Sequence, residues 1–158
     1  MMHIMMDLDL TAIDSTHRAR YHADGSIDLT YWRVNSTREK IFQDTLLPVS
    51  ETWRELQMRK DCHIIVCTAR VISKDDIDYL AHHGLRYNVL LSRKEGDNTP
   101  DATLKVLALK QYAKSIGKSW AVFCATCFAY DDNDAILATL SKHNINTFDS
   151  KILNGKIA

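Results

Sequence analysis

Short apolar runs alternate along the chain with longer amphipathic stretches. The runs typical of β-strands are residues 2–6, 63–67, 87–91, part of 121–130, and 146–148. The stretches with helical periodicity are residues 48–60, 74–83, 100–115 and 133–143. Strand and helix in alternation imply right-handed crossovers between parallel strands. The pattern therefore predicts an α/β fold in three layers, a doubly wound parallel sheet with helices on both faces.

One segment departs from this alternation. Residues 18–35, which we call the flap, contain two β-prone stretches on either side of Asp24-Gly25. This dipeptide favours a type I′ turn and so predicts a β-hairpin. Because the flap follows the first strand closely, it would stand over the carboxyl edge of the sheet, where the parallel strands end. We expect either a cover over a site at that edge or a surface hairpin without function.

Composition and charge limit the classes of protein to consider. The chain has 158 residues, of which 46% are hydrophobic, enough for one domain with a single core over residues 1–158. Lys and Arg number 20 and so do Asp and Glu, so no global field draws the protein onto nucleic acid or a membrane. The N-terminal stretch is too short for a signal peptide, and no apolar stretch approaches the roughly 20 residues of a membrane span. We therefore expect a soluble cytoplasmic protein without a membrane partner.

The four cysteines allow three interpretations. Cys124 and Cys127 have the C-x-x-C spacing of a zinc site or of a redox pair. Cys62 and Cys67, in contrast, belong to one strand-like run and would face opposite sides of the sheet. We expect buried free thiols rather than a metal site or a redox pair.

Candidate chemistry first appears where the first strand ends. Asp7 and Asp9 follow the apolar run directly, and side chains two positions apart on an extended segment share a face. Open α/β sheets bind ligands outside the carboxyl ends of their strands, so the two carboxylates are placed to contact one cation or one reacting group. A polar turn after a strand is the alternative interpretation.

Further polar residues fall at equivalent places in the strand order. They follow two other strands or open the third helix, and they are Thr68, Arg70, Asp101, Lys105, Asp131 and Asp132. Each also has a structural interpretation, as a helix cap or as a solvated surface charge. A Rossmann-like sheet, however, brings its strand ends together at one edge. We therefore expect these side chains to gather around Asp7 and Asp9.

The spacing of these residues resembles that of the haloacid dehalogenase (HAD) superfamily of phosphotransferases. The four motifs of that superfamily match Asp7-x-Asp9-x-Thr11, Thr68, Lys105 and Asp131-Asp132. Within it, the chain most resembles the phosphatase domain of the bacteriophage polynucleotide kinase/3′-phosphatase family. That closer likeness is carried by Arg18, Thr68-Ala69-Arg70, Gly96-Asp97, Asp101-x-x-x-Lys105 and the paired aspartates. It implies a HAD-like Rossmann fold with a hairpin flap and no large cap domain.

The chain departs from the pattern of that family at several places. Leu10 stands where a Gly is usual, and residues 115–130 form a longer connection than expected. The kinase half is absent as well. Gly117-Lys118-Ser119 is similar to the end of a P-loop, but that motif needs a Gly where Tyr112 stands. We expect no kinase activity.

The resemblance implies a chemical role for each matched residue. Asp7 would attack phosphorus and form an aspartyl-phosphate, and Asp9 would protonate the leaving alcohol and then deprotonate water. Thr68 would donate a hydrogen bond to a phosphoryl oxygen. Lys105 would neutralise charge on the phosphate and on Asp7.

The same resemblance implies a Mg²⁺ cofactor and side chains that contact the substrate. Mg²⁺ prefers oxygen ligands, and the ligands implied here are Asp7, the backbone carbonyl of Asp9, Asp131, and Asp132 directly or through water. Arg18 and Arg70 suit bidentate contacts to phosphate. Asp101 would position Lys105 or one of the arginines.

Three functions remain open on the sequence alone. The first is a Mg²⁺-dependent phosphatase that acts on 3′-phosphate ends of nucleic acid, because the flap is too small to enclose a substrate. Aromatic and basic residues on or beside the flap could stack on a base or contact a second phosphate, or could equally pack the flap against the body; they are Tyr21, His22, Tyr31, Trp32 and Arg33. The second is a 5′(3′)-nucleotidase that acts on free nucleoside monophosphates. The third, from another class, is a non-catalytic nucleotide-binding module. The neutral net charge favours contacts to one or two nucleotides over binding along a polymer.

Overall fold

A parallel sheet of five strands forms the centre of the computed structural model, which describes residues 1–155. In the order β5-β4-β1-β6-β7, the strands are Val89–Leu91, Cys62–Cys67, Met2–Met6, Cys127–Asp131 and Asn146–Asp149. The first strand lies in the middle, with Met6 paired to Val66 on one side and to Tyr130 on the other. The chain therefore winds outward from β1 in both directions, which confirms the predicted doubly wound sheet.

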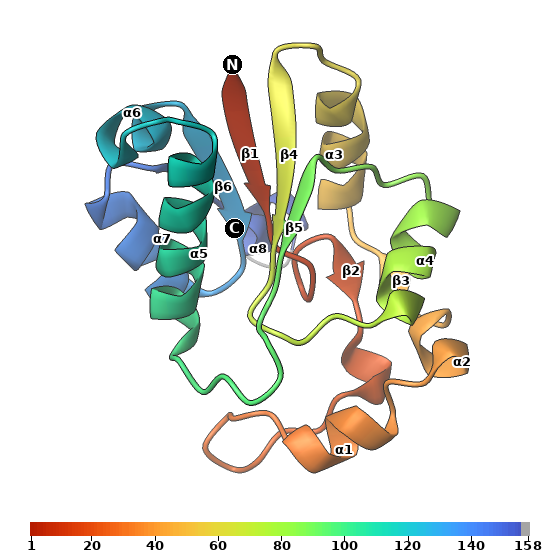
Figure 1. The fold of residues 1–158 in the computed structure, drawn as a ribbon. Helices are drawn as coiled ribbons and strands as arrows, with labels where there is room; N and C mark the ends of the chain where they lie inside the picture. Colours follow the sequence, from red (N-terminus) through yellow and green to blue (C-terminus); the bar gives the residue numbers. More distant parts are fainter. Residues whose placement is uncertain (156–158) are drawn as a thin grey trace.

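Helices cover both faces of the sheet, as Figure 1 shows. One face carries α3 (Val49–Gln57) and α4 (Lys74–His82), and the other carries α5 (Asp101–Ser115), α6 (Trp120–Ala125) and α7 (Asp134–Lys142). A short last helix, α8 (Ser150–Leu153), follows β7 directly. Within residues 1–155, none of the helices has the length and apolar character needed to cross a membrane.

The two central apolar runs, β1 and β4, are strands with both faces buried. In β1, Ile4 and Met6 belong to the core beneath α3 and α4, whereas Met5 belongs to the core beneath α5, α6 and α7. A strand that is buried on both faces reads as a continuous apolar run rather than as an alternation. This explains why the central strands could be placed from the sequence.

Residues 121–130 divide between a helix and a strand. The helix α6 ends at Ala125 and β6 begins at Cys127. The Ser119 side chain caps this helix by accepting a hydrogen bond from the Val122 amide, and Phe123 is buried while Val122 is exposed. The strand predicted for part of this run is therefore confirmed in its last part, whereas the helix in its first part was not predicted, since a short apolar segment does not reveal its period.

The hairpin predicted for the flap is only partly formed. A single isolated bridge joins Tyr21 to Ile27, and the second β-prone stretch is a helix, α1 (Leu29–Val34). Asp28 starts this helix by accepting a hydrogen bond from the Tyr31 amide. The hairpin expectation for residues 29–35 was wrong because a helix cap outweighs the β propensity of the following residues.

The turn of the flap also differs from the predicted type I′. Gly25 has φ 86°, but Asp24 is not among the described non-glycine residues with positive φ, which a type I′ turn would require. The Asp24 carboxylate accepts hydrogen bonds from the amide and hydroxyl of Ser26. This local turn holds Asp24 in an ordinary conformation and leaves Gly25 to adopt the left-handed one.

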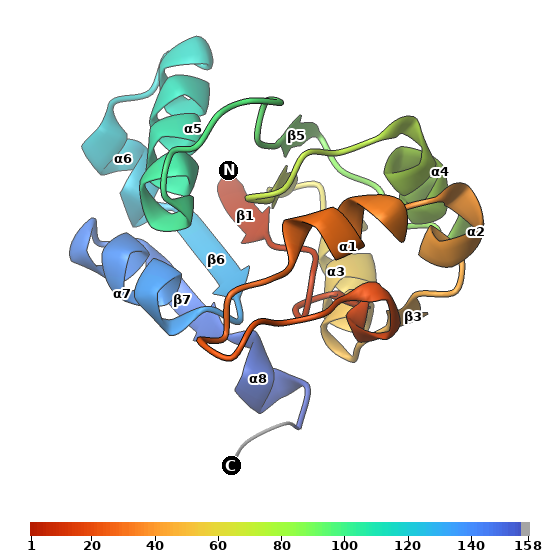
Figure 2. The same cartoon turned by 90° about the horizontal axis from the view of Figure 1, so that it is seen from below.

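Short elements complete the connection between β1 and α3. They are β2 (Ile13–Asp14), the 3₁₀ turn η1 (Thr16–Arg18), α2 (Arg38–Ile41) and β3 (Thr45–Leu46), with β2 and β3 antiparallel. Figure 2 shows α1 and the rest of the flap lying across the carboxyl ends of the strands. The flap is therefore placed where it can cover chemistry at this edge.

All four cysteines are buried free thiols, as expected. Burial raises the pKa of Cys67 to about 12 and also raises the pKa of Cys124 and Cys127. Such thiols stay protonated at neutral pH and are poor nucleophiles and poor metal ligands.

Candidate active site

The carboxyl edge of the sheet gathers the residues that follow β1, β4 and β6. Asp7 comes directly after β1, Asp131 is the last residue of β6, and Thr68 comes directly after β4. The Asp7 amide donates a hydrogen bond of 3.1 Å to the Tyr130 carbonyl, which continues the β1–β6 ladder to the edge. All three side chains are buried. Parallel pairing thus brings together residues that are far apart in the sequence.

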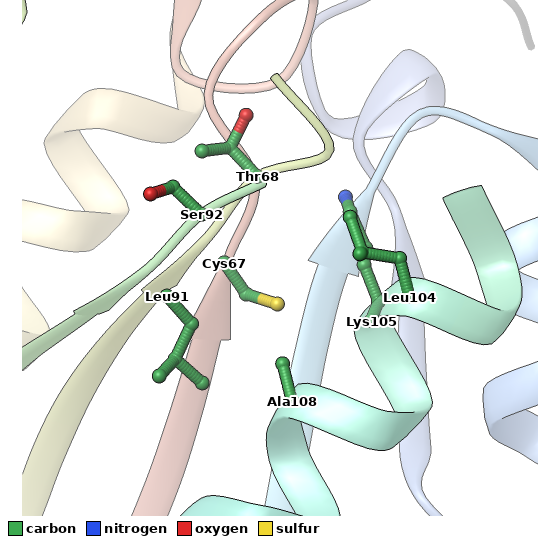
Figure 3. Close-up of a pocket in the computed structure, with 7 residues that line it drawn as sticks. All are labelled: Cys67, Thr68, Leu91, Ser92, Leu104, Lys105 and Ala108. Carbon is green, nitrogen blue, oxygen red and sulfur yellow. The ribbon is translucent and has the colours of Figure 1, made fainter. Parts of the chain in front are cut away.

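Lys105 links two of these carboxylates. Its Nζ donates to Asp7 Oδ1 at 2.9 Å and to Asp131 Oδ2 at 2.6 Å, and the side chain is 2% exposed. Figure 3 shows Lys105 extending from α5 so that its amino group lies at the same end of the pocket as Thr68. Burial alone would lower the pKa of Lys105, but the two carboxylates outweigh it and raise the pKa above its usual value. Lys105 is therefore a fixed positive charge beside Asp7.

Asp7, Asp131 and Asp132 form an acidic cluster. One carboxylate oxygen of each lies within 4.8 Å of the others. Burial raises the pKa of Asp131 and of Asp132, and the charge on Asp7 raises both further. Three carboxylates around a single ammonium group leave excess negative charge in a region with little water. Among the described residues, this cluster has the donor set and the charge that fit a divalent cation with oxygen ligands.

Asp9 lies outside this cluster and is held by other residues. Its Oδ1 accepts a hydrogen bond from the Ser15 hydroxyl at 2.9 Å, and its Oδ2 accepts one from Arg70 Nε at 2.6 Å. Arg70 also pairs with Asp76 at 2.9 Å. Both oxygens of Asp9 are thus occupied, and its predicted backbone contact to a metal stays a prediction.

The whole sequence matches the model of one protein family. The model of the family described as bacteriophage T5 5′-deoxynucleotidase matches residues 1–158. The chain belongs to this family. The 5′-deoxynucleotidase of Escherichia phage T5 is 27% identical over 165 residues, which cover 96% of this chain and 68% of that protein.

Solved structures similar to this member of the T5 5′-deoxynucleotidase family show the same fold. A haloacid dehalogenase-like hydrolase of Streptococcus pneumoniae has a TM-score of 0.67 and 10% identity, with 94% of this chain and 84% of that chain covered. A chain of the Pnkp1/Rnl/Hen1 RNA repair complex has a TM-score of 0.61 and 17% identity. That match covers 94% of this chain, which spans only 42% of the length of the RNA repair chain. The predicted HAD-like fold is confirmed, and this family member is a hydrolase of the phosphatase class.

Thr68 lines a small cavity beside Lys105 in this family member. The cavity has a volume of about 30 Å³, room for a single water-sized group, and its lining residues are Cys67, Thr68, Leu91, Ser92, Leu104, Lys105 and Ala108 (Figure 3). The Thr68 hydroxyl oxygen accepts a hydrogen bond of 3.3 Å from the Arg70 amide. Its proton is therefore free to point elsewhere, as a phosphate-binding hydroxyl requires.

Arg18 lies apart from the cluster. Its Nε and Nη2 both donate to Asp44 at 2.9 Å, and its Nη1 donates to Ser36 at 3.0 Å. The side chain is fully buried beneath Trp32, whose ring centre lies 4.2 Å from Cζ. These contacts give Arg18 a structural role at the base of the flap, and its predicted contact to phosphate stays a prediction.

Asp101 contacts an arginine that the sequence analysis did not identify. Its Oδ1 accepts a hydrogen bond of 2.8 Å from Arg93, not from Lys105, Arg18 or Arg70. Arg93 also donates to the carbonyl of Ala69, which ties the loop after β5 to the loop after β4. The sequence contained a signal for Arg93, since it comes two residues after the end of β5 and Arg70 comes three residues after the end of β4.

Two further hydroxyl side chains near Asp7 were given no role of their own from the sequence. The Thr11 hydroxyl donates to Asp7 Oδ2 at 3.0 Å, and it lies 3.1 Å from the hydroxyl of Ser150. Ser150 follows β7, so a search of every strand end for polar residues would have included it. Thr11 was predicted only as part of the motif Asp7-x-Asp9-x-Thr11, and no role was predicted for Ser150.

Proposed function

We propose that the protein is a 5′-nucleotidase that removes phosphate from deoxynucleoside 5′-monophosphates through an aspartyl-phosphate. The observation that carries this proposal is the buried Asp7, held by Lys105 and Thr11 at the carboxyl edge of the sheet. The substrate class is suggested by the relative in Escherichia phage T5, which is named a 5′-deoxynucleotidase and is aligned with 96% of this chain.

Asp7 would act as the nucleophile. One of its oxygens attacks phosphorus, the bond between phosphorus and the nucleoside oxygen breaks, and the phosphoryl group becomes attached to Asp7. Lys105 and the Thr68 hydroxyl would stabilise the negative charge on the phosphoryl oxygens as it shifts. A water molecule then attacks the same phosphorus atom, which releases inorganic phosphate and restores the Asp7 carboxylate.

Asp9 would move the proton in both steps. It donates a proton to the leaving nucleoside oxygen and then takes one from the attacking water. In the present structure both of its oxygens accept hydrogen bonds, from Ser15 and Arg70. Arg70 must therefore release Asp9 before Asp9 can donate, and a phosphate group provides a competing partner for the guanidinium.

Mg²⁺ fits the acidic cluster of Asp7, Asp131 and Asp132. When bound, it would reduce the repulsion between the nucleophile and a phosphate dianion. Burial, and after it the charge on Asp7, raises the pKa of Asp131 and of Asp132, and a bound cation would offset the charge repulsion among the three carboxylates.

Removal of divalent cations is expected to abolish phosphate release. Adding Mg²⁺ to the stripped protein should raise its melting temperature, because the cation stabilises only the folded cluster. Differential scanning calorimetry with EDTA and then with excess Mg²⁺ measures this shift. Asp131→Asn should show a much smaller shift, whereas Asp134→Asn, whose carboxylate is 85% exposed and outside the cluster, should match the wild type. Equal shifts in both variants would place the cation elsewhere.

A polynucleotide 3′-phosphatase is the second candidate function. Among the described residues, the flap lies across the carboxyl edge, and Tyr21 within it is 51% exposed. An edge with so small a cover admits the end of a polymer as readily as a free nucleotide. A non-catalytic nucleotide-binding module is disfavoured by the complete arrangement of Asp7, Lys105 and Asp131.

A substrate panel separates the candidates. We expect kcat/KM for deoxynucleoside 5′-monophosphates to exceed that for a 3′-phosphorylated oligonucleotide by at least about 10-fold. The measurement is release of inorganic phosphate at saturating Mg²⁺, with ribonucleoside 5′-monophosphates and a 5′-phosphorylated oligonucleotide in parallel. The reverse order would favour the 3′-phosphatase. Absence of turnover on every phosphomonoester would favour the binding module.

A further inference from the structure

We propose that Ser150, the first residue of α8, positions the nucleophile Asp7 through the hydroxyl of Thr11. This inference rests on the proposed function, because it assigns Asp7 as the reacting carboxylate. Ser150 touches neither Asp7 nor the expected place of the substrate. It is therefore a positioning residue that acts through another side chain.

A chain of two hydrogen bonds leads from α8 to Asp7. The Ser150 and Thr11 hydroxyl oxygens are 3.1 Å apart, and Thr11 Oγ1 lies 3.0 Å from Asp7 Oδ2. Ser150 and Thr11 are both fully buried, and Asp7 is 6% exposed. Water has little access to compete for these two hydrogen bonds, so both of them persist in the folded protein.

The donor and the acceptor of each of these two hydrogen bonds follow from the number of hydroxyl protons. An ionised carboxylate can only accept, so the single hydroxyl proton of Thr11 is donated to Asp7. Thr11 then has only lone pairs to offer to Ser150, so Ser150 is the donor of the 3.1 Å contact, and its 3.5 Å contact with the Leu10 carbonyl is the longer and weaker of the two. The proton of Ser150 thus fixes the rotation of the Thr11 hydroxyl toward Asp7.

Other residues of the C-terminal segment hold α8 against the same loops. Asn154 Nδ2 donates to the Thr11 carbonyl at 2.9 Å, and Asn154 Oδ1 accepts from the Val49 amide at 2.9 Å. Lys151 Nζ donates to the Asp132 carbonyl at 2.6 Å. The position of Ser150 is therefore fixed relative to both the nucleophile loop and the acidic cluster.

These hydrogen bonds control the orientation of the Asp7 carboxylate. Lys105 binds Oδ1 and Thr11 binds Oδ2, so the two bonds together set the rotation of the carboxylate plane. Loss of the Ser150 donor frees the Thr11 hydroxyl to rotate and loosens one of these constraints. Small errors in the aim of a nucleophile reduce the rate of the chemical step more than substrate binding.

A double-mutant cycle tests the proposal. Ser150→Ala is expected to lower kcat about 10-fold, the size associated with one buried hydrogen bond, while KM changes by less than about 2-fold. In a Thr11→Val background, Ser150→Ala should lower kcat by less than about 2-fold, because valine has no hydroxyl group to link Ser150 to Asp7. The rate is measured with Mg²⁺ on the best substrate of the panel and on p-nitrophenyl phosphate.

Ser50→Ala is the matched control. Ser50 is also a buried serine at a helix start, and its hydroxyl donates at 2.7 Å to the Leu47 carbonyl, away from Asp7. This variant should lower the melting temperature and leave kcat unchanged. If Ser150→Ala does not fold, Ser150→Cys, which keeps a weaker donor, replaces it in the cycle with a smaller expected loss.

Three results would overturn the proposal. They are equal losses from Ser150→Ala in the wild-type and Thr11→Val backgrounds, a rise in KM at constant kcat, and an unchanged kcat. Each of these leaves an active enzyme and so leaves the proposed function intact. A wild-type protein without turnover on any phosphomonoester would instead overturn both the proposed function and this inference.

Discussion

Asp7→Asn is expected to reduce phosphate release by on the order of 10⁴-fold or more, because an amide cannot attack phosphorus to form the acyl-phosphate. The substitution preserves the shape of the side chain, and the single amide oxygen can accept a hydrogen bond from either Lys105 or Thr11 but not from both. It also removes one negative charge from the acidic cluster, which relieves the repulsion among the three carboxylates. The variant should therefore remain folded while losing activity.

Single-turnover and steady-state assays on the same preparation measure this loss. Glu51→Gln is the matched control, since Glu51 lies on α3 with a side chain that is 68% exposed and pairs only with the neighbouring Arg54 among the contacts described. Its turnover should equal that of the wild type. An Asp7→Asn protein that retained more than about 1% of wild-type turnover at saturating Mg²⁺ would exclude Asp7 as the nucleophile.

Lys105→Met is expected to destabilise the fold by about 3–5 kcal/mol at neutral pH as well as to abolish activity, because it removes one partner from a buried ionic group. Asp7 and Asp131 would then face each other without the ammonium group that now lies 2.9 Å and 2.6 Å from their oxygens. Urea unfolding followed by circular dichroism measures the loss of stability.

The stability of this variant should depend on pH in a defined direction. Burial and the charge on Asp7 already raise the pKa of Asp131 to about 6 in the presence of Lys105. Without Lys105 the pKa rises further, and an acid whose pKa is higher in the folded than in the unfolded state gains stability as the pH falls. Part of the loss should therefore be recovered between about pH 8 and about pH 5, by more than in the wild type.

Lys114→Met serves as the control on the same helix, because Lys114 is exposed near the end of α5. It should change the stability by no more than about 0.5 kcal/mol and leave turnover unchanged. A Lys105→Met protein as stable as the Lys114→Met protein at neutral pH would show that the ammonium group is not needed to balance the cluster.

Much of the fold could be predicted because its signals are local. The run Met2–Met6 is apolar on both faces and is followed at once by Asp7, which marks a central strand and its carboxyl end. Once β1, β4 and β6 are taken as parallel neighbours, the meeting of Asp7, Thr68 and Asp131 follows from sheet geometry. The placement of Lys105 beside them follows from the position of α5.

The remaining features depend on contacts that leave no local signal. Ser150 reaches Thr11 across 139 positions, and a serine after a strand resembles an ordinary helix cap. Arg18 and Asp44 are 26 positions apart, and nothing near either residue in the sequence indicates that they pair. The structure of the flap was predicted wrongly for a different reason. Leu29–Val34 contains β-prone residues but forms a helix after the Asp28 cap.

The buried pair of Arg18 and Asp44 anchors the base of the flap. Their bidentate contact fixes the first residue of the flap against the body of the protein, whereas Tyr21, three residues further on, is 51% exposed. A leaving group at this edge would therefore meet a flap that is anchored at its base and open to solvent at Tyr21.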